Sequence, residues 1–215
     1  VMLGHEVSYK STEYLLGEAM GFPFDQMEND NMGIGATPSK VESTYYDKTL
    51  LSFYARGNYN YDNRYLFTAT VRADGSTVFS ANKKWGFFPS FSAAWRVSEE
   101  AFMKDIHWIS NFKVRLGWGT VGNDNIPNYL SLDLYEANKY GLGNSSVTVL
   151  NPKQLRNKNL KWEGSNTINL GVDLGFLDNR LNVTAEFFIK NTKDLLLSQS
   201  LAHITGFDSQ MQNVG

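Results

Sequence analysis

The amino-acid sequence predicts an all-β protein, a segment of an antiparallel transmembrane β-barrel with about seven long strands. Three observations support this fold class. Apolar and polar residues alternate with the period of a β-strand, the alternating runs are unusually long, and the connections between them alternate between long and short. Helical periodicity is nearly absent.

The alternation defines the expected strands. In the clearest run, residues 51–61, the odd positions are mostly apolar or aromatic and the even positions are mostly polar. The N-terminal run is the weakest. We expect strands at residues 1–7, 49–61, 64–74, 86–97, 112–122, 166–176 and 181–191.

The length of these runs favours a membrane barrel over a soluble sheet. Strands of soluble proteins usually have about 5–6 residues, whereas these runs have roughly 10–13. A strand of about 11 residues, tilted by about 40°, crosses roughly 28 Å, which is close to the thickness of a bilayer's hydrocarbon core. A soluble carbohydrate-binding sandwich gives no reason for such uniform length, so it is disfavoured.

The connections show the asymmetry of outer-membrane barrels, in which short turns face the periplasm and long loops lie outside. Short turns are expected at Asp62-Asn63 and Asp178-Asn179, and long outer loops at residues 8–48 and 123–165. The linker that follows the fourth strand is expected to begin with a helical turn capped by Ser98.

Each predicted hairpin has one register that places its two apolar faces together. In the first hairpin this register requires a three-residue loop over residues 62–64, with Asn63 or its neighbour at positive φ. A slip of one residue would turn every side chain to the opposite face. The expected pairs are Tyr61 with Tyr65, Tyr59 with Phe67, Phe176 with Leu181, and Leu170 with Phe187.

In a barrel the apolar face contacts lipid and the polar face lines the lumen. Aromatic residues near strand ends suit the water–lipid interface, although strands favour aromatic residues in any setting. Charges on the polar face either hold a plug and line the substrate path or form a solvated wall. The residues expected to face lipid are Phe53, Tyr59, Phe67, Phe91, Trp95, Trp118, Leu170 and Phe187. Those expected to face the lumen or a plug are Arg56, Arg64, Arg72, Arg96, Lys113, Arg115, Asp173, Glu186 and Lys190.

The composition excludes several classes of function. The absence of cysteine excludes a disulfide framework and thiolate metal or redox sites. The net charge of −2 gives no reason to expect nucleic acid as a partner, and no run of about 18 apolar residues could form a transmembrane helix. The start of the chain, Val1 to Gly4, lacks the features of a signal peptide. We therefore expect that a signal was removed or that the chain begins within a longer protein.

No motif predicts a catalytic residue, a metal site or a cofactor, so we do not expect an enzyme. Gly117 to Gly122 match a dinucleotide-binding spacing, but loop residues follow instead of a helix. We expect Gly117 and Gly119 to let another backbone approach from the lumen. Residues 28–33 resemble the start of a calcium loop, which fails at Met32. The three histidines are scattered without ligand spacing.

Several runs occur together in an order that resembles a known family. They are Arg72 to Ser76, the stretch WGFFPSFSAAWR from Trp85 to Arg96, Ile109 to Arg115, Thr120 to Asn123, Asn159 to Glu163, Leu177 to Leu181, and Lys193 to Leu196. As an ordered set they resemble SusC/RagA-type TonB-dependent outer-membrane transporters of Bacteroidetes-like bacteria. The resemblance covers most of the chain from about Leu51 onward.

The resemblance implies a barrel of about 22 strands, closed by an N-terminal plug, that imports oligosaccharides or peptides with energy from TonB. It also implies a location in the bacterial outer membrane, in contact with its lipid. The implied protein partners are a SusD-like surface lipoprotein and the TonB complex. The plug, the TonB-contacting region and the closing strands are absent from this sequence. About seven strands cannot close around a plug, so we expect a segment of a longer chain.

Substrate contact is expected in the outer loops, because aromatic rings stack on sugars and Asn or Asp side chains bind hydroxyl groups. The same aromatic residues would alternatively pack the loops together or grip the lipoprotein. The candidates are Trp85, Asn123, Asp124, Tyr129, Tyr135, Tyr140 and Trp162. Two other functions remain open, a passive smaller outer-membrane barrel and a surface β-rich adhesin or binding module.

Overall fold

The computed structural model describes residues 1–24, 31–143 and 145–215. Glu28, Asn29 and Asp30 of the calcium-like stretch lie outside these described residues. The chain forms two units, residues 1–7 with 50–215 and residues 8–49, and each is described by itself. The first unit carries most of the main sheet and all the candidate functional residues named from the sequence.

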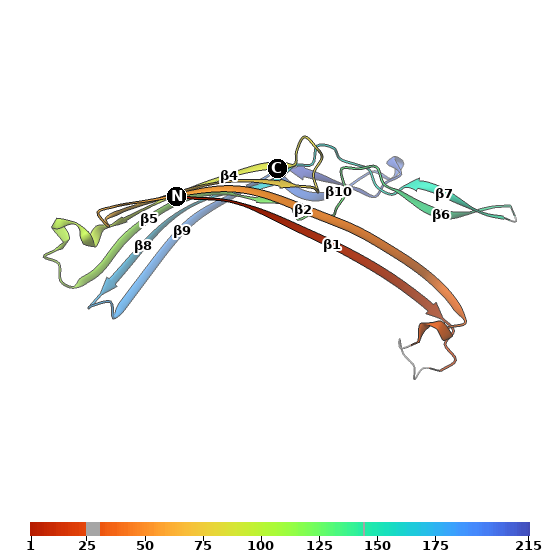
Figure 1. Ribbon diagram of the computed structural model, residues 1–215, viewed down its shortest axis with the longest axis horizontal. Coiled ribbons are helices and arrows are strands. Elements are labelled where there is room, and N and C mark those ends of the chain that lie inside the picture. Colours follow the sequence, from red (N-terminus) through yellow and green to blue (C-terminus); the bar gives the residue numbers. More distant parts are fainter. Residues whose placement is uncertain (25–30, 144) are drawn as a thin grey trace. The chain divides into compact units, whose positions relative to one another are not determined.

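The main sheet has seven strands in the order β1-β2-β3-β4-β5-β8-β9. Neighbouring strands from β2 to β9 pair antiparallel, and Figure 1 shows β5, β8 and β9 side by side. The predicted all-β, antiparallel class is therefore confirmed. The strands are β1 (Met2–Met20), β2 (Thr37–Tyr61), β3 (Tyr65–Ser76), β4 (Trp85–Arg96), β5 (Ile109–Asn123), β8 (Glu163–Phe176) and β9 (Leu181–Lys193).

Two further sheets have two strands each. One pairs β6 (Tyr135–Leu142) with β7 (Ser145–Pro152), and the other pairs β10 (Leu195–Ser200) with β11 (Ser209–Val214). Short 3-10 helices are η2 (Met32–Ile34), η3 (Val97–Glu99), η4 (Ala101–Met103) and η5 (His203–Thr205). None of the helices in the described part of the chain is long and apolar enough to span a membrane.

The helical turn after β4 differs from the prediction in its cap. Ser98 lies inside η3, and the N-cap residue is Arg96, whose side chain makes no capping hydrogen bond. The predicted cap is wrong because the turn begins at Val97, one residue before the expected capping position.

The predicted registers of both hairpins are confirmed. Tyr61 pairs with Tyr65 and Tyr59 with Phe67, and the equivalent pairs of the second hairpin join β8 to β9 as expected. In the first turn Asp62 and Asn63 have φ values of 52° and 53°. The amide of Arg64 donates a hydrogen bond to the Tyr61 carbonyl at 3.0 Å. Positive φ at both central residues matches the right-handed twist of the strands.

The two segments expected as long loops contain regular strands. β1 continues to Met20 and β2 begins at Thr37, so much of residues 8–48 is extended backbone, and β6 and β7 lie within residues 123–165. Most described side chains in residues 8–48 are exposed, and no apolar stripe marks these strands in the sequence. Backbone pairing between β1 and β2 nevertheless defines these strands.

The buried hydrophobic residues lie under the loops and not on the sheet. Val78, Phe79, Ile126 and Leu160 form one cluster, against which Leu130, Trp162, Leu196 and Met211 pack. Along the sheet the large apolar side chains remain exposed, for example Phe53 at 50% and Phe187 at 65%. Among the described residues, therefore, no second sheet covers the apolar face.

Candidate functional site

The strand pairings place the predicted lipid-facing residues on one side of the sheet, here called the apolar face. Directly paired residues of antiparallel strands point to the same side. One row of pairs crosses six strands, from β2 to β9, and runs through Tyr59, Phe67, Ala93, Leu116, Leu170 and Phe187. Phe53, Phe91, Trp95 and Trp118 share the parity of this row in their strands. The eight residues thus form one continuous surface.

The opposite side, here called the polar face, carries most of the predicted lumen-facing charges. One row joins Arg56 on β2 to Lys190 on β9 through Thr70, Ser90, Gly119 and Thr167. Another pairs Arg96 with Lys113 and Lys113 with Asp173. Arg72, Arg115 and Glu186 also lie on this face.

Two arginines of the polar face bind carboxylates and link neighbouring strands. Arg115 donates to Asp173 at 2.9 and 3.1 Å and lies 2.9 Å from a Glu186 oxygen. Arg72 donates to Asp74 at 2.7 Å and to the buried Ser52 hydroxyl at 2.9 Å. Hydrogen bonds between charged partners are stronger than neutral ones, so each cluster joins adjacent strands.

Arg64 does not lie on the polar face, because β2 ends at Tyr61 and β3 begins at Tyr65. The arginine lies in the turn, where it pairs with Asp62 and donates to Glu100 at 3.2 Å. The three-residue loop that the register requires takes this position out of the strands. The assignment of Arg64 to the lumen or a plug stays a prediction.

Glu100 ties the linker after β4 to the aromatic residues at the turn end of the sheet. Its carboxylate accepts hydrogen bonds from the Tyr65 hydroxyl at 2.7 Å and from the Trp95 indole at 3.0 Å. These two rings stack, with centroids 6.5 Å apart. The hydrogen bonds from Tyr65 and Trp95, followed by that from Arg64, lower the pKa of the Glu100 carboxyl from its ordinary value.

The two tryptophans proposed for substrate contact occupy different surroundings. Trp85 is the first residue of β4 and not a loop residue, and its ring stacks against Phe53 at 6.1 Å. It therefore lies on the apolar face. Trp162 is half-buried beside Phe79 and Phe88, and its indole donates to the Lys84 carbonyl at 2.8 Å. Its ring thus packs the loops together.

The remaining loop candidates do not converge on one point. Asn123 donates to Glu163 at 3.2 Å, and Asp124 accepts a hydrogen bond from Ser76 at 2.6 Å. Tyr135 and Tyr140 are exposed on the β6–β7 hairpin and differ by an odd number of positions along β6, so their side chains point to opposite faces. Of these loop candidates, Tyr129 belongs to the lining of the pocket described next.

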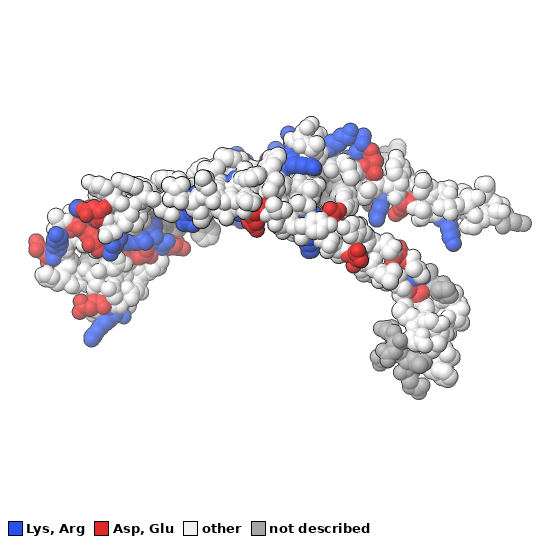
Figure 2. Space-filling model, viewed as in Figure 1, with Lys and Arg blue, Asp and Glu red and all other residues white. Residues whose placement is uncertain are grey.

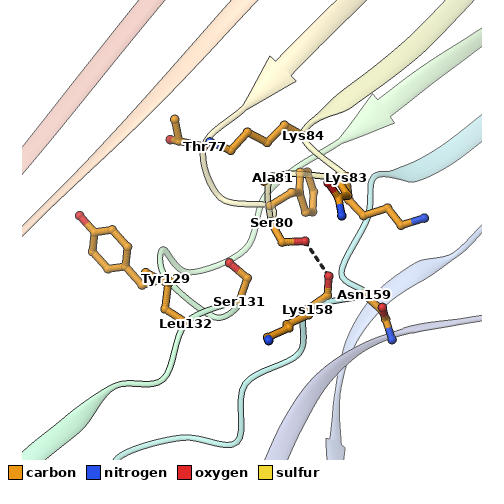
Figure 3. A pocket seen from close by; sticks show the side chains of 12 residues that line it. Thr77, Ser80, Ala81, Lys83, Lys84, Tyr129, Ser131, Leu132, Lys158 and Asn159 are labelled. Atoms are coloured by element: carbon orange, nitrogen blue, oxygen red, sulfur yellow. Dashed lines mark hydrogen bonds between the residues drawn. The ribbon is translucent and has the colours of Figure 1, made fainter.

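This pocket, here called the loop pocket, has a volume of about 680 Å³ and opens between three loop segments (Figure 3). The first segment is residues 77–84, of which all but the buried Val78 line the pocket. The second is residues 129–132, of which all but Leu130 line it, and the third is residues 158–159. The lining includes Lys83, Lys84 and Lys158, which the sequence analysis did not single out. The adjacent lysines in the loop before β4 were a visible signal, but Lys158 joins them only through the fold.

The glycine-rich run of β5 is closely approached by its neighbouring strands. A Cβ added at Gly117 would collide with the Asn169 side chain of β8, and one added at Gly119 would lie 3.0 Å from the Ser90 Cβ and 3.7 Å from the Ser90 Cα of β4. These contacts explain why small residues are needed within the sheet. The approach of another backbone from the lumen stays a prediction.

Comparison with known proteins identifies the family. The family model described as TonB dependent receptor-like, beta-barrel matches residues 3–215. This chain belongs to the TonB-dependent receptor family. Among relatives of this receptor segment, "TonB-dependent receptor SusC" of Bacteroides thetaiotaomicron is 43% identical over 173 residues, covering 78% of the chain and 17% of that protein. "TonB-dependent receptor P3" of Formosa agariphila is 34% identical over 212 residues, covering 99% of the chain and 21% of that protein.

A solved structure shows the same fold. "Structure of the RagAB peptide transporter" superposes on this receptor segment with a TM-score of 0.87 and 29% sequence identity, covering 99% of the chain and 23% of the matched chain. The segment thus spans about a fifth of the length of the proteins it resembles. The SusC/RagA resemblance, the Bacteroidetes affinity and the location in the bacterial outer membrane are confirmed by these relatives.

Proposed function

We propose that the full-length receptor imports a nutrient, an oligosaccharide or a peptide, across the outer membrane with energy from TonB. This segment forms barrel wall and outer loops and has a transport role instead of a catalytic one. One observation carries the proposal. An uncovered apolar face backs directly onto a charged polar face in a chain 43% identical to SusC.

The apolar face is best explained by lipid. Trp118, Leu170 and Phe187 are 40%, 47% and 65% exposed, and they lie in adjacent strands. A water-soluble protein rarely leaves so continuous an apolar surface uncovered. Trp85 belongs to this surface and stacks on Phe53, so we assign it to the water–lipid interface and not to the substrate.

The charges of the polar face divide into two groups. Arg72 and Arg115 form ion pairs with carboxylates and help to link strands of the barrel wall. Among the described residues, Arg56 and Lys190 form no ion pair, and they lie in one row with small residues between them. We assign this second pair to contact with the plug or the passing substrate, because their charges are not compensated within the segment.

The partners follow from the relatives. We propose a SusD-like surface lipoprotein and the TonB complex, because the chain resembles SusC and a structure named RagAB. The name of the RagAB peptide transporter supports a peptide as one class of substrate, and an oligosaccharide is the other class that the SusC/RagA resemblance implies. Outer-membrane lipid completes the surroundings of the barrel wall.

A transport assay tests this proposal. A strain that lacks the full-length receptor is complemented with it, and uptake of labelled oligosaccharide and peptide mixtures is measured with and without TonB. We expect the receptor to restore uptake from one mixture, and we expect removal of TonB to abolish that uptake. Deletion of the TonB-contacting region of the receptor serves as the matched control, because it leaves the barrel wall unchanged.

The other two functions give different results in the same assay. A passive smaller barrel would restore uptake that persists without TonB. An adhesin or binding module would restore no uptake in either strain, although it would bind cells to a surface. Either result contradicts the proposal.

A further inference from the structure

The loop pocket is bounded by segments that the fold holds in place. Phe79 forms part of its wall and is also a member of the buried cluster beside Val78 and Leu160. The Ser80 hydroxyl donates to the Lys158 carbonyl at 2.6 Å, which joins two of the three segments. The third segment is held by Gln154, whose amide donates to the carbonyls of Tyr129 and Leu132. A site whose loops are fixed before binding loses little entropy on ordering.

The charge of the loop pocket is positive. Its described lining contains Lys83, Lys84 and Lys158 and no acidic side chain, and none of these lysines forms an ion pair with a described residue. The nearby Asp133 and Asp194 are already paired, with Arg156 and Lys161 respectively. In Figure 2 basic side chains gather near the C-terminus, over this end of the sheet. The pocket therefore favours an anion.

The side chains of the three lysines extend in different directions. In Figure 3 Ser80 lies between Lys84 and Lys158, and the Lys84 side chain extends toward Thr77. Lys83 extends away from Tyr129. Lys84 is also half-buried, whereas Lys83 is exposed. We therefore place the main attraction for an anion at Lys84 and Lys158.

The other lining groups fit a sugar. Thr77, Ser80 and Ser131 supply hydroxyl groups, Asn82 and Asn159 supply amides, and Tyr129 supplies a ring. Such groups bind sugar hydroxyls and the apolar faces of sugar rings. One recurring way to bind a peptide is to add it as a strand to an open sheet edge. The described residues that line this pocket belong instead to loops and strand ends.

We propose that the loop pocket binds an anionic oligosaccharide, with acidic groups of different sugar units attracted to Lys84 on one side and to Lys158 on the other. Its volume of about 680 Å³ lies within the range of ligand pockets. The inference rests on the proposed import function and narrows its substrate class. The ring of Tyr129 forms one side of the site, and the lysines select for charge.

Binding to the purified full-length receptor tests the inference. The probes are a galacturonic acid tetrasaccharide, a sulfated galactose tetrasaccharide, neutral maltotetraose and tetraglutamate, and calorimetry gives each Kd. We expect one of the two anionic sugars to bind at least about tenfold more tightly than maltotetraose, because charge-assisted hydrogen bonds are worth more than neutral ones. The two sugars distinguish carboxylate from sulfate.

The variants Lys84→Ala and Lys158→Ala should each weaken binding of the anionic sugar about tenfold. Lys153→Ala is the matched control, because Lys153 is an exposed lysine that does not line the pocket, and its Kd should stay unchanged. Added salt should weaken the wild-type affinity and bring it toward that of the variants.

Three outcomes would overturn the inference. They are failure of both anionic sugars to bind, equal affinity in the wild type and the two lysine variants, and tighter binding of tetraglutamate than of either sugar. The transport assay is read separately. If TonB-dependent uptake of some nutrient persists while the anionic sugars fail to bind, this inference fails and the import function stands. If no uptake depends on the receptor, the import function itself fails.

Discussion

Arg115 on β5 donates two hydrogen bonds to Asp173 on β8, from Nε to Oδ2 at 2.9 Å and from Nη2 to Oδ1 at 3.1 Å. Glu186 on β9 lies 2.9 Å from the same Nη2 atom. A single guanidinium therefore joins three consecutive strands of the sheet. The planar fork of arginine fixes the geometry of a carboxylate that it binds through two nitrogens, so the cluster supports the register of these strands.

Removal of this guanidinium should destabilise the barrel. In Arg115→Gln, Asp173 loses both bonds while its side chain is only 23% exposed, so we expect a loss of about 1–2 kcal/mol. Urea unfolding of the full-length receptor in lipid vesicles, followed by tryptophan fluorescence, measures the change. Arg156→Gln removes a more exposed pair with Asp133 and should cost less than about 0.5 kcal/mol. Equal losses in the two variants would contradict the role of Arg115.

Phe187 and Phe188 offer a direct test of which face meets lipid. They are adjacent on β9 and are 65% and 67% exposed in this segment, but their side chains point to opposite faces. Phe187→Arg should destabilise the folded barrel by about 2–4 kcal/mol, because the charge enters the centre of the bilayer. Phe188→Arg is the matched control and should cost much less.

Refolding of both variants into vesicles of defined lipid gives the comparison. The mobility shift of the folded barrel on unheated gels reports the folded fraction, and urea titration reports its stability. A larger loss for Phe188→Arg would reverse the assignment of the faces. The proposed outer-membrane topology of the segment would then be wrong.

The stabilisation that Glu100 provides between the linker after β4 and the turn end of the sheet should depend on pH. The hydrogen bonds from Tyr65, Trp95 and Arg64 lower the pKa of its carboxyl in the folded state. A lowered folded pKa means that the stabilisation is fully present above the ordinary pKa of 4.5. It is lost as the pH falls through the folded value.

We therefore expect Glu100→Gln to be less stable than the wild type near neutral pH, with a difference that shrinks as the pH falls below about 4.5. Urea unfolding at a series of pH values measures this difference. Glu99→Gln is the matched control, because Glu99 pairs with Arg96 three positions earlier and its side chain is 45% exposed. A difference that grows in acid would contradict the assignment.

The alternation of apolar and polar residues predicts those parts of the sheet in which one face is apolar. Pairs such as Leu170 with Phe187 have only one register that keeps both side chains on the apolar face. The strands within residues 8–48 give no such signal, because most of their described side chains are exposed and no face needs to be apolar. Backbone pairing defines those strands, and it leaves little trace in the order of side chains.

The candidate site was predicted less well because loops create it. Trp85 and Trp162 looked alike in the sequence, yet one stacks on Phe53 at the apolar face and the other packs against Phe79. Lys84 and Lys158 line the same pocket although they are far apart in the sequence. No local pattern records such a juxtaposition. The buried cluster beneath the loops and the hydrogen bond from Ser80 to the Lys158 carbonyl bring the two segments together.

The turn between β2 and β3 depends on backbone conformation at Asn63, whose φ is 53°. A β-branched residue is strained at positive φ, whereas glycine adopts it freely. Asn63→Val should therefore lower stability by about 1–2 kcal/mol relative to Asn63→Gly. Both variants lose the hydrogen bond that the Asn60 amide donates to the Asn63 side chain at 2.6 Å, so that loss cancels in the comparison. Urea unfolding of the two full-length variants measures the difference. Equal midpoints would show that this turn does not hold the left-handed conformation on which the register of β2 and β3 rests.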